Sequence, residues 1–159
     1  MTQEEKQLLL RDLCARLPYG VKYCRDSWNY EWDQEMSVVE VLEDIDKDGY
    51  INYHKVYKVW DIKPYLRPMS SMTEEEREDA REKFFDGSDH YDIDDIGEIY
   101  ADTYQPYTTV YTLSFARLSG YIDWLNAHHF DYRIDPSTGK TLIESNLAIV
   151  APEEMYGNV

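Results

Sequence analysis

The apolar positions at the start of the chain predict a helix. Its apolar residues recur at helical intervals, at Leu9, Leu10, Leu13, Cys14 and Leu17. Thr2 and Glu5 have the spacing of a capping box at its N-terminus, and Pro18 and Gly20 are typical of its end. We therefore expect a helix that starts after Thr2, with Cys14 as a small hydrophobic residue on its buried side.

From Val21 to about Trp60 the residue types change to β-branched and aromatic side chains in short runs separated by polar breaks. This pattern predicts three to five antiparallel strands in a small curled sheet. Asp48 and Gly49 predict a tight hairpin turn, because glycine accepts a positive φ without strain. The segment Asp61–Pro68 holds two prolines and is expected to leave the sheet.

The second half of the chain reads as mainly helical. Thr73, with Glu76 three residues later, predicts the N-cap of a second helix that runs to about Phe85. Residues 108–113 are typical of a strand, and Ser119 is expected to cap a third helix that ends near His128.

The predicted fold class is α+β, with an N-terminal helix, a small antiparallel sheet that could curl like a barrel, and a mainly helical second half. Residues 1–159 are expected to form a single domain. Within it, 1–68 are the helix and the β-rich half, and 69–159 are the acidic half.

Charge narrows the classes of partner. Acidic residues outnumber basic ones 32 to 16, for a net charge of −16. This balance argues against direct binding to nucleic acid backbones or anionic membranes, which both need clustered Lys and Arg. No apolar run reaches the ~20 residues of a membrane span. Residues 1–10 lack a signal-peptide pattern, and two cysteines do not make a disulfide framework. We expect a soluble cytoplasmic protein.

The negative charge is concentrated between Thr73 and Asp102, a stretch that contains thirteen acidic residues and three basic ones. The candidate acidic binding face comprises Glu74, Glu75, Glu78, Asp79, Glu82, Asp86, Asp89, Asp92, Asp94 and Asp95. Asp79 and Lys83 have the spacing of a favourable helical ion pair. Such a face could mimic nucleic acid phosphates and engage a basic groove on a protein. A solvated face that only keeps the protein in solution is the alternative.

Tyrosine is unusually frequent, at 15 of 159 residues. Tyr91, Tyr100 and Tyr104 lie in the acidic stretch, and we take them as candidate aromatic contacts of the same face. Tyrosine offers a large area with a polar tip, and its ring attracts Lys and Arg. Tyrosine also fills sheet surfaces, which is the alternative explanation.

The stretch from Asp44 resembles the first nine positions of an EF-hand calcium loop. Its weak candidate ligands are Asp44, Asp46, Asp48 and Asn52. However, Lys55 stands where a bidentate glutamate should close the shell, and the residues before the loop favour a strand. A hairpin turn is therefore favoured over a metal site.

Catalytic and cofactor motifs are missing. The chain has no Gly-x-Ser-x-Gly elbow, no His-Glu-x-x-His or Cys-x-x-Cys pattern and no complete phosphate-binding loop. The neighbouring His128 and His129 would point about 100° apart on a helix, so they do not converge on one ion. We expect a protein that is not an enzyme and has no cofactor.

Four strings carry a resemblance to a known family: Lys6–Lys22, Asp61–Glu76, Ile122–Arg133 and Leu142–Met155. They resemble a family of small uncharacterised proteins encoded by bacteriophages and mobile elements of anaerobic gut bacteria. The resemblance brings no catalytic residues. It implies a small accessory protein that acts in the cytoplasm of a bacterial host.

Together these features predict a non-enzymatic acidic protein that binds a basic surface of a host or defence protein, acting as a nucleic-acid mimic and inhibitor. One alternative is a structural or oligomeric phage protein without a host target. Another is a weak calcium-binding module at Asp44–Asn52.

Overall fold

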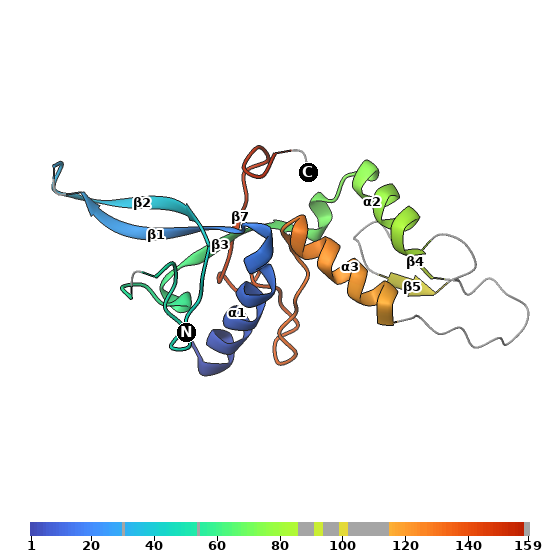
Figure 1. Cartoon of the computed structure of the whole chain (residues 1–159), viewed down its shortest axis with the longest axis horizontal. Coiled ribbons are helices and arrows are strands. Elements are labelled where there is room, and N and C mark those ends of the chain that lie inside the picture. The colour runs from blue at the N-terminus through green and yellow to red at the C-terminus, as the bar shows by residue number, and fades with distance from the viewer. Residues whose placement is uncertain (30, 54, 86–90, 94–98, 102–114, 158–159) are drawn as a thin grey trace, which may run out of the picture.

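The computed structural model describes residues 1–29, 31–53, 55–85, 91–93, 99–101 and 115–157. It has an N-terminal helix, a mixed sheet and further helices, so the predicted α+β class is confirmed (Figure 1). The sheet is not a closed barrel, and its strands are not all antiparallel.

Helix α1 (Gln3–Arg16) begins with the predicted capping box. The Thr2 hydroxyl accepts a hydrogen bond from the amide of Glu5 at 3.1 Å, and the Glu5 carboxylate accepts one from the amide of Thr2 at 2.8 Å. A single 3₁₀ turn, η1 (Leu17–Tyr19), ends the segment at the left-handed Gly20. The capping box and Gly20 therefore predicted both ends of this helical segment correctly.

The expectation that Cys14 is buried was wrong, because its side chain is exposed. The buried side of α1 carries Leu9 and Leu13 together with the charged residues Asp12 and Arg16. Successive helical residues point about 100° apart, so this side turns Cys14 outward.

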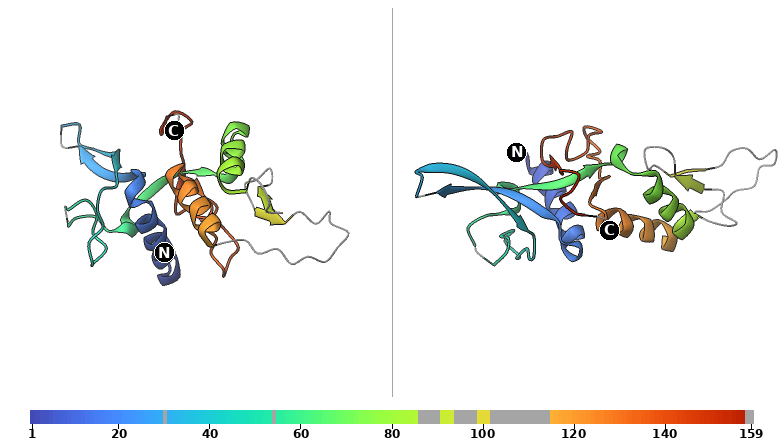
Figure 2. Two further views of the ribbon diagram at one scale, coloured as in Figure 1. Left: turned by 45° about the vertical axis from the view of Figure 1, so that its right-hand side comes forward. Right: turned by 90° about the horizontal axis from the view of Figure 1, so that it is seen from above.

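Strands β1 (Lys22–Asn29) and β2 (Gln34–Val41) form an antiparallel ladder of eight consecutive residue pairs. Figure 1 and both views of Figure 2 show this hairpin as an arm that projects from the body. Strand β2 lies at the edge of the sheet.

Strand β3 (Lys63–Pro68) is a correction, because Asp61–Pro68 was expected to leave the sheet. It pairs with β1 antiparallel, and with the two short strands β6 (Phe130–Asp131) and β7 (Ile149–Val150) in parallel. The prolines are tolerated because they stand near the two ends of a short strand, where fewer ladder hydrogen bonds are needed.

The segment between β2 and β3 does not add the further strands that were predicted. It is a series of turns with isolated bridges, such as Ile45 with Ile51, followed by the 3₁₀ turn η2 (Val59–Asp61). The predicted turn at Gly49 is present, with φ of +88°. Three non-glycine residues with positive φ interrupt extended structure here: Asn52, Tyr53 and Lys55.

The second half begins with the 3₁₀ turn η3 (Met69–Ser71) and helix α2 (Glu74–Ala80). The capping box of Thr73 and Glu76 is present as predicted. A π-helical turn, η4 (Arg81–Phe85), continues α2, so helical structure reaches the predicted end.

Helix α3 (Phe115–Ala127) includes the four described residues before Ser119, so the prediction of a helix cap at Ser119 was wrong. A small antiparallel hairpin joins β4 (Tyr91–Ile93) and β5 (Ile99–Ala101). The strand predicted over 108–113 lies outside the described residues.

Two clusters of buried side chains form the core. The first joins α1 to β1, β3 and the C-terminal segment through Leu9, Leu13, Val21, Tyr23, Leu66, Leu142 and Leu147. The second joins α2 and η4 to α3 through Ala80, Phe85, Tyr121, Trp124, Leu125 and Phe130. Because residues 142–148 return to the first cluster, the two sequence halves interleave. No helix in the described part of the chain is long and apolar enough to cross a membrane.

Candidate binding surface

The acidic helix α2 is fixed firmly to the body. Ala80 is fully buried, and the Trp124 indole of α3 donates a hydrogen bond to the Asp79 carboxylate at 3.0 Å. Arg67 of β3 donates two hydrogen bonds, each of 2.7 Å, to the Glu76 carboxylate. Burial opposes the charge of Glu76, but the hydrogen bonds from Arg67 and Thr73 outweigh it and lower the pKa of this carboxyl.

The turn η4 adds an aromatic contact with α3. Phe85 meets the Tyr121 ring edge-on, with centroids 5.4 Å apart. Phe84 lies directly over Gly120, where an added Cβ would come within 2.7 Å of the phenyl ring. Glycine at this position therefore permits the close approach of the two helices.

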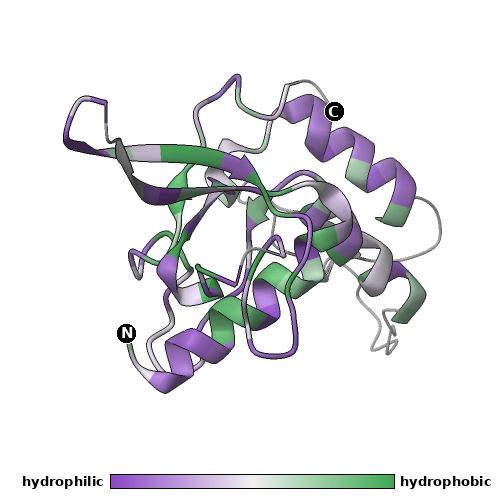
Figure 3. Ribbon diagram, turned by 60° about the vertical axis from the view of Figure 1, so that its left-hand side comes forward, coloured by the Kyte–Doolittle hydropathy of each residue, from purple (hydrophilic) through white to green (hydrophobic). Residues whose placement is uncertain are grey.

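The opposite side of α2 and η4 presents carboxylates to solvent, at Glu74, Glu75, Glu78 and Glu82. At about 100° per residue these four positions fall within an arc of roughly 100°. Figure 3 shows that this helical segment is hydrophilic over most of its length. We call these four residues the α2 carboxylate face.

Internal ion pairs partly neutralise the α2 carboxylate face. Glu74 pairs with Arg77 and, at 3.6 Å, with Arg81. Arg81 also pairs with Glu78 at 2.6 Å. Glu75 and Glu82 make no ion pair with another described residue, so they carry the uncompensated charge.

Asp79, which was predicted to belong to this face, points elsewhere. Its predicted ion pair with Lys83 is present at 3.0 Å. This hydrogen bond and the one from Trp124 lower the pKa of the Asp79 carboxyl, although partial burial acts in the other direction. Asp79 therefore helps to attach the helix.

The rest of the predicted acidic and aromatic face is only partly covered by the structure. Asp86, Asp89, Asp94, Asp95 and Tyr104 lie outside the described residues. The backbones of Tyr91, Asp92 and Tyr100 belong to the β4–β5 hairpin, in which Asp92 pairs with Tyr100. The α2 carboxylate face is therefore the part of the predicted surface whose side chains are placed.

Asp46, one of the candidate calcium ligands, stabilises the turn in which it lies. The Asp46 carboxylate accepts hydrogen bonds from the amides of Asp48 and Tyr50, both at 2.9 Å. No group of three or more His, Cys, Asp or Glu side chains within the described ranges could hold a metal ion.

Asn52 is turned into the protein. Its side-chain oxygen accepts a hydrogen bond from the Glu43 amide at 2.7 Å, and its amide group donates to the Val41 carbonyl and the Tyr23 hydroxyl. These bonds to residues 9 to 29 positions away satisfy the Asn52 side-chain amide within the fold.

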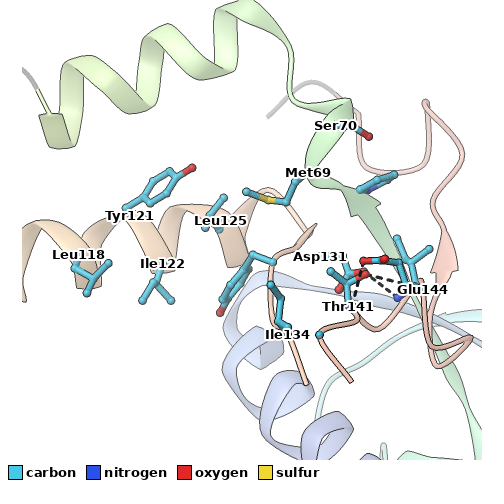
Figure 4. Close-up of a pocket in the computed structure, with 14 residues that line it drawn as sticks. Met69, Ser70, Leu118, Tyr121, Ile122, Leu125, Asp131, Ile134, Thr141 and Glu144 are labelled. Atoms are coloured by element: carbon cyan, nitrogen blue, oxygen red, sulfur yellow. Dashed lines mark hydrogen bonds between the residues drawn. The ribbon is translucent and has the colours of Figure 1, made fainter. Parts of the chain in front are cut away.

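An apolar groove of about 830 Å³ lies beside α3 (Figure 4). Its walls include Met69, Leu118, Tyr121, Ile122, Leu125, Ile134 and Ile143. Its two charged lining residues are Asp131 and Glu144. The groove can accept apolar side chains, and its Met69 wall leads directly into α2.

Asp131 anchors one end of this groove. Its carboxylate accepts hydrogen bonds from the amides of Leu142 and Ile143, at 3.2 and 2.8 Å. Burial raises the pKa of the Asp131 carboxyl despite these bonds. Sequence reasoning missed the groove, although the helical spacing of Leu118, Ile122 and Leu125 was a signal for an apolar stripe.

A buried ion pair on α1 was also missed. Asp12 and Arg16 are completely buried and 2.7 Å apart. Arg16 also donates to the Phe130 carbonyl at 2.6 Å, and Arg133 donates to Asp12 at 3.2 Å. The i, i+4 spacing of the pair was the available signal. The cluster holds α1 against β6.

The chain matches no protein-family model, and neither a curated protein nor a solved structure matches it significantly. A functional proposal therefore depends on the chemistry of this chain's own residues, above all on the α2 carboxylate face.

Proposed function

We propose that this protein is a non-enzymatic binding protein whose α2 carboxylate face contacts a basic surface of another protein. One observation carries the proposal: four exposed carboxylates share one side of a helix whose other side is fixed to the body. Since the helix is already ordered, little backbone entropy is lost when a partner binds.

The electrostatics favour a basic partner. Glu75 and Glu82 form no ion pair within the described part of the chain, and the whole chain carries a net charge of −16. At physiological ionic strength such a field acts over about 8 Å and speeds encounter with positive surfaces. The apolar groove beside α3 could take an apolar side chain of the same partner, which would add affinity to this steering.

The proposed class of target is a nucleic-acid-binding protein, including a host defence protein, which this protein would inhibit by mimicry. Glu74 to Glu82 span eight residues, or about 12 Å at the helical rise. Glu75 and Glu82, which lie outside the internal ion pairs, are seven residues or about 10 Å apart, close to three phosphate steps of 3.4 Å along a DNA strand. The sequence resemblance supports the setting, an accessory protein of a phage or mobile element in the bacterial cytoplasm.

Affinity capture from a bacterial lysate tests the proposal with a matched control. The test variant is Glu75→Lys with Glu82→Lys. The control is Glu153→Lys with Glu154→Lys, which changes the net charge equally at exposed positions near the C-terminus. We expect the wild type and the control to retain the same basic proteins in equal amounts. The test variant should retain at least tenfold less of each.

Equal capture by all three baits would contradict the proposal, because neither the α2 carboxylate face nor the total charge would then matter. Equal losses in both variants would also contradict it, because total charge alone would then explain the binding. A defined oligomer seen by light scattering, with no bound host protein, would favour a structural role instead.

A further inference from the structure

The outer edge of β2 has free backbone hydrogen-bonding groups. Among the described residues β2 pairs with β1 and with no other strand. Register and hydrogen bonding show which groups point outward. The Leu42 amide bonds the Val21 carbonyl at 2.8 Å, directly across the ladder.

Bonded and non-bonded pairs alternate along an antiparallel ladder. Val39 and Val41 therefore belong to non-bonded pairs, as do Glu35 and Ser37, and their backbone groups face away from β1. The Val41 carbonyl confirms this direction, because it accepts a hydrogen bond from the Asn52 side chain outside the ladder. Asn52 thus closes the body end of the edge, and the amides and carbonyls of Glu35, Ser37 and Val39 point outward without a partner among the described residues.

This edge has little of the usual protection against strand pairing. Natural edge strands are commonly blocked by Pro, by charged side chains (Lys above all), by a bulge or by short length, and the exposed charge on β2 is that of Glu35. The eight residues of β2 contain no Pro, Lys or Arg, and their register with β1 runs without a bulge. Val39 is 48% exposed and Val41 is 41% exposed, so the strand also offers apolar area. In Figures 1 and 2 no described helix or strand lies along the outer edge of β2.

We propose that the β2 edge binds an extended segment of a partner protein as an added strand. Backbone hydrogen bonds to Glu35, Ser37 and Val39 supply the affinity in this mode of recognition. Side chains opposite Val39 would be apolar, and a Lys or Arg would lie beside the exposed Glu35, since cross-strand pairs of opposite charge are favourable.

A second copy of this chain fits the edge poorly. Two bodies that each carry −16 repel one another. A single strand edge is also small compared with the ~1,200–2,000 Å² that stable interfaces between folded proteins bury. A short unstructured segment avoids both difficulties.

The experiment uses a display library of random twelve-residue peptides selected on the full-length wild-type protein. Enriched peptides are then synthesised, and their affinities are measured by fluorescence polarisation. Ser37→Pro removes an outward amide without touching the β1 ladder, and Ser37→Ala is the matched control that keeps this amide. Circular dichroism and thermal melting establish that each variant is folded, and Val39→Lys replaces Ser37→Pro if the latter does not fold.

We expect enriched peptides that alternate apolar residues with Lys or Arg. Ser37→Pro should weaken their binding at least tenfold, and Ser37→Ala should not. The Glu75→Lys/Glu82→Lys variant should bind them normally, which separates this inference from the proposed function of α2.

Three results would overturn the inference. One is a library that yields no enriched peptide. A second is a set of peptides that bind the edge variant as tightly as the wild type. The third is a wild-type dimer in light scattering that Ser37→Pro abolishes, because the edge would then serve self-pairing.

Discussion

Helices α1 and α2 use the same local chemistry in opposite ways. Both start with a threonine and glutamate capping box, and both carry acidic and basic residues at helical spacing. In α1 the pair Asp12–Arg16 is 0% exposed, whereas in α2 the carboxylates of Glu74 and Glu78 are 68% and 64% exposed. The same kind of ion pair is therefore enclosed by the fold in one helix and left at the surface in the other.

The difference arises from chain segments that are far apart in the sequence. Arg16 donates a hydrogen bond to the Phe130 carbonyl of β6, and Arg133 donates one to the Asp12 carboxylate. Strand β6 and Arg133 therefore enclose the ion pair of α1. On α2 the corresponding enclosure is limited to its inner side, at Arg67 and Trp124. Burial by distant residues thus decides whether a charge is structural.

The largest expected effect is the loss of the buried carboxylate. Asp12→Ala leaves Arg16 buried without its partner, and we expect it to lower the free energy of unfolding by about 3–5 kcal/mol. Glu78→Ala, on the exposed pair, should cost less than about 1 kcal/mol. Urea denaturation measures both. Similar losses for the two variants would remove the contrast between the helices.

The next largest effect is the pH dependence of stability that the buried His129 causes. Burial lowers the pKa of His129 to about 4, and the charges of Arg16, His128, Arg67 and Lys22 add to this effect. His129 is 4% exposed, and its ring stacks on the Tyr156 ring with the two centroids 3.6 Å apart. The unfolded chain therefore binds a proton below about pH 6.5 that the folded protein does not bind until about pH 4.

Stability should accordingly fall as the pH is lowered from 6.5 towards 4, by up to ~3 kcal/mol from this group alone. His129→Asn removes the titration, and Asn tolerates the left-handed backbone at this position, where φ is +63°. The free energy of unfolding, measured at several pH values, should depend less on pH in the variant. Parallel curves for the two proteins would show that His129 is not the cause.

The capping threonines should behave alike despite the different surroundings of their helices. Thr2→Ala and Thr73→Ala each remove a hydroxyl that accepts a hydrogen bond from a backbone amide. Each should lower the free energy of unfolding by about 1 kcal/mol. Thermal or urea unfolding of both variants measures this. A cost several times larger at one cap would mean that its role extends beyond the first helical turn.

The smallest effect on stability is expected for the α2 carboxylate face. Glu75→Lys with Glu82→Lys alters exposed residues outside the internal ion pairs, so the free energy of unfolding should stay within ~0.5 kcal/mol of the wild type. A large destabilisation would assign these carboxylates a structural role.

Local signals in the sequence predicted the parts of the fold that local chemistry determines. The caps at Thr2 and Thr73 and the turn at Gly49 were found in this way, because each depends on residues within a few positions. Strand β3 was missed, since its place in the sheet comes from pairing with β6 and β7, more than 60 residues away.

The same reasoning applies to the candidate surfaces. Helical spacing predicted that Glu74, Glu78 and Glu82 lie on one side, and all three are exposed there. It did not predict that Asp79 turns towards Trp124, nor that the distant Arg133 joins the pair on α1. These contacts depend on how the elements pack, which one sequence does not reveal.

The most direct test of the central claim is the salt dependence of binding to the purified protein recovered by affinity capture. Its affinity is measured for the wild type, for Glu75→Lys/Glu82→Lys and for Glu153→Lys/Glu154→Lys at several salt concentrations. We predict that the wild type and the C-terminal control bind equally and weaken steeply with salt, while the α2 variant binds at least tenfold more weakly and depends less on salt. The same affinity and the same salt dependence for all three proteins would contradict a binding role for the α2 carboxylate face.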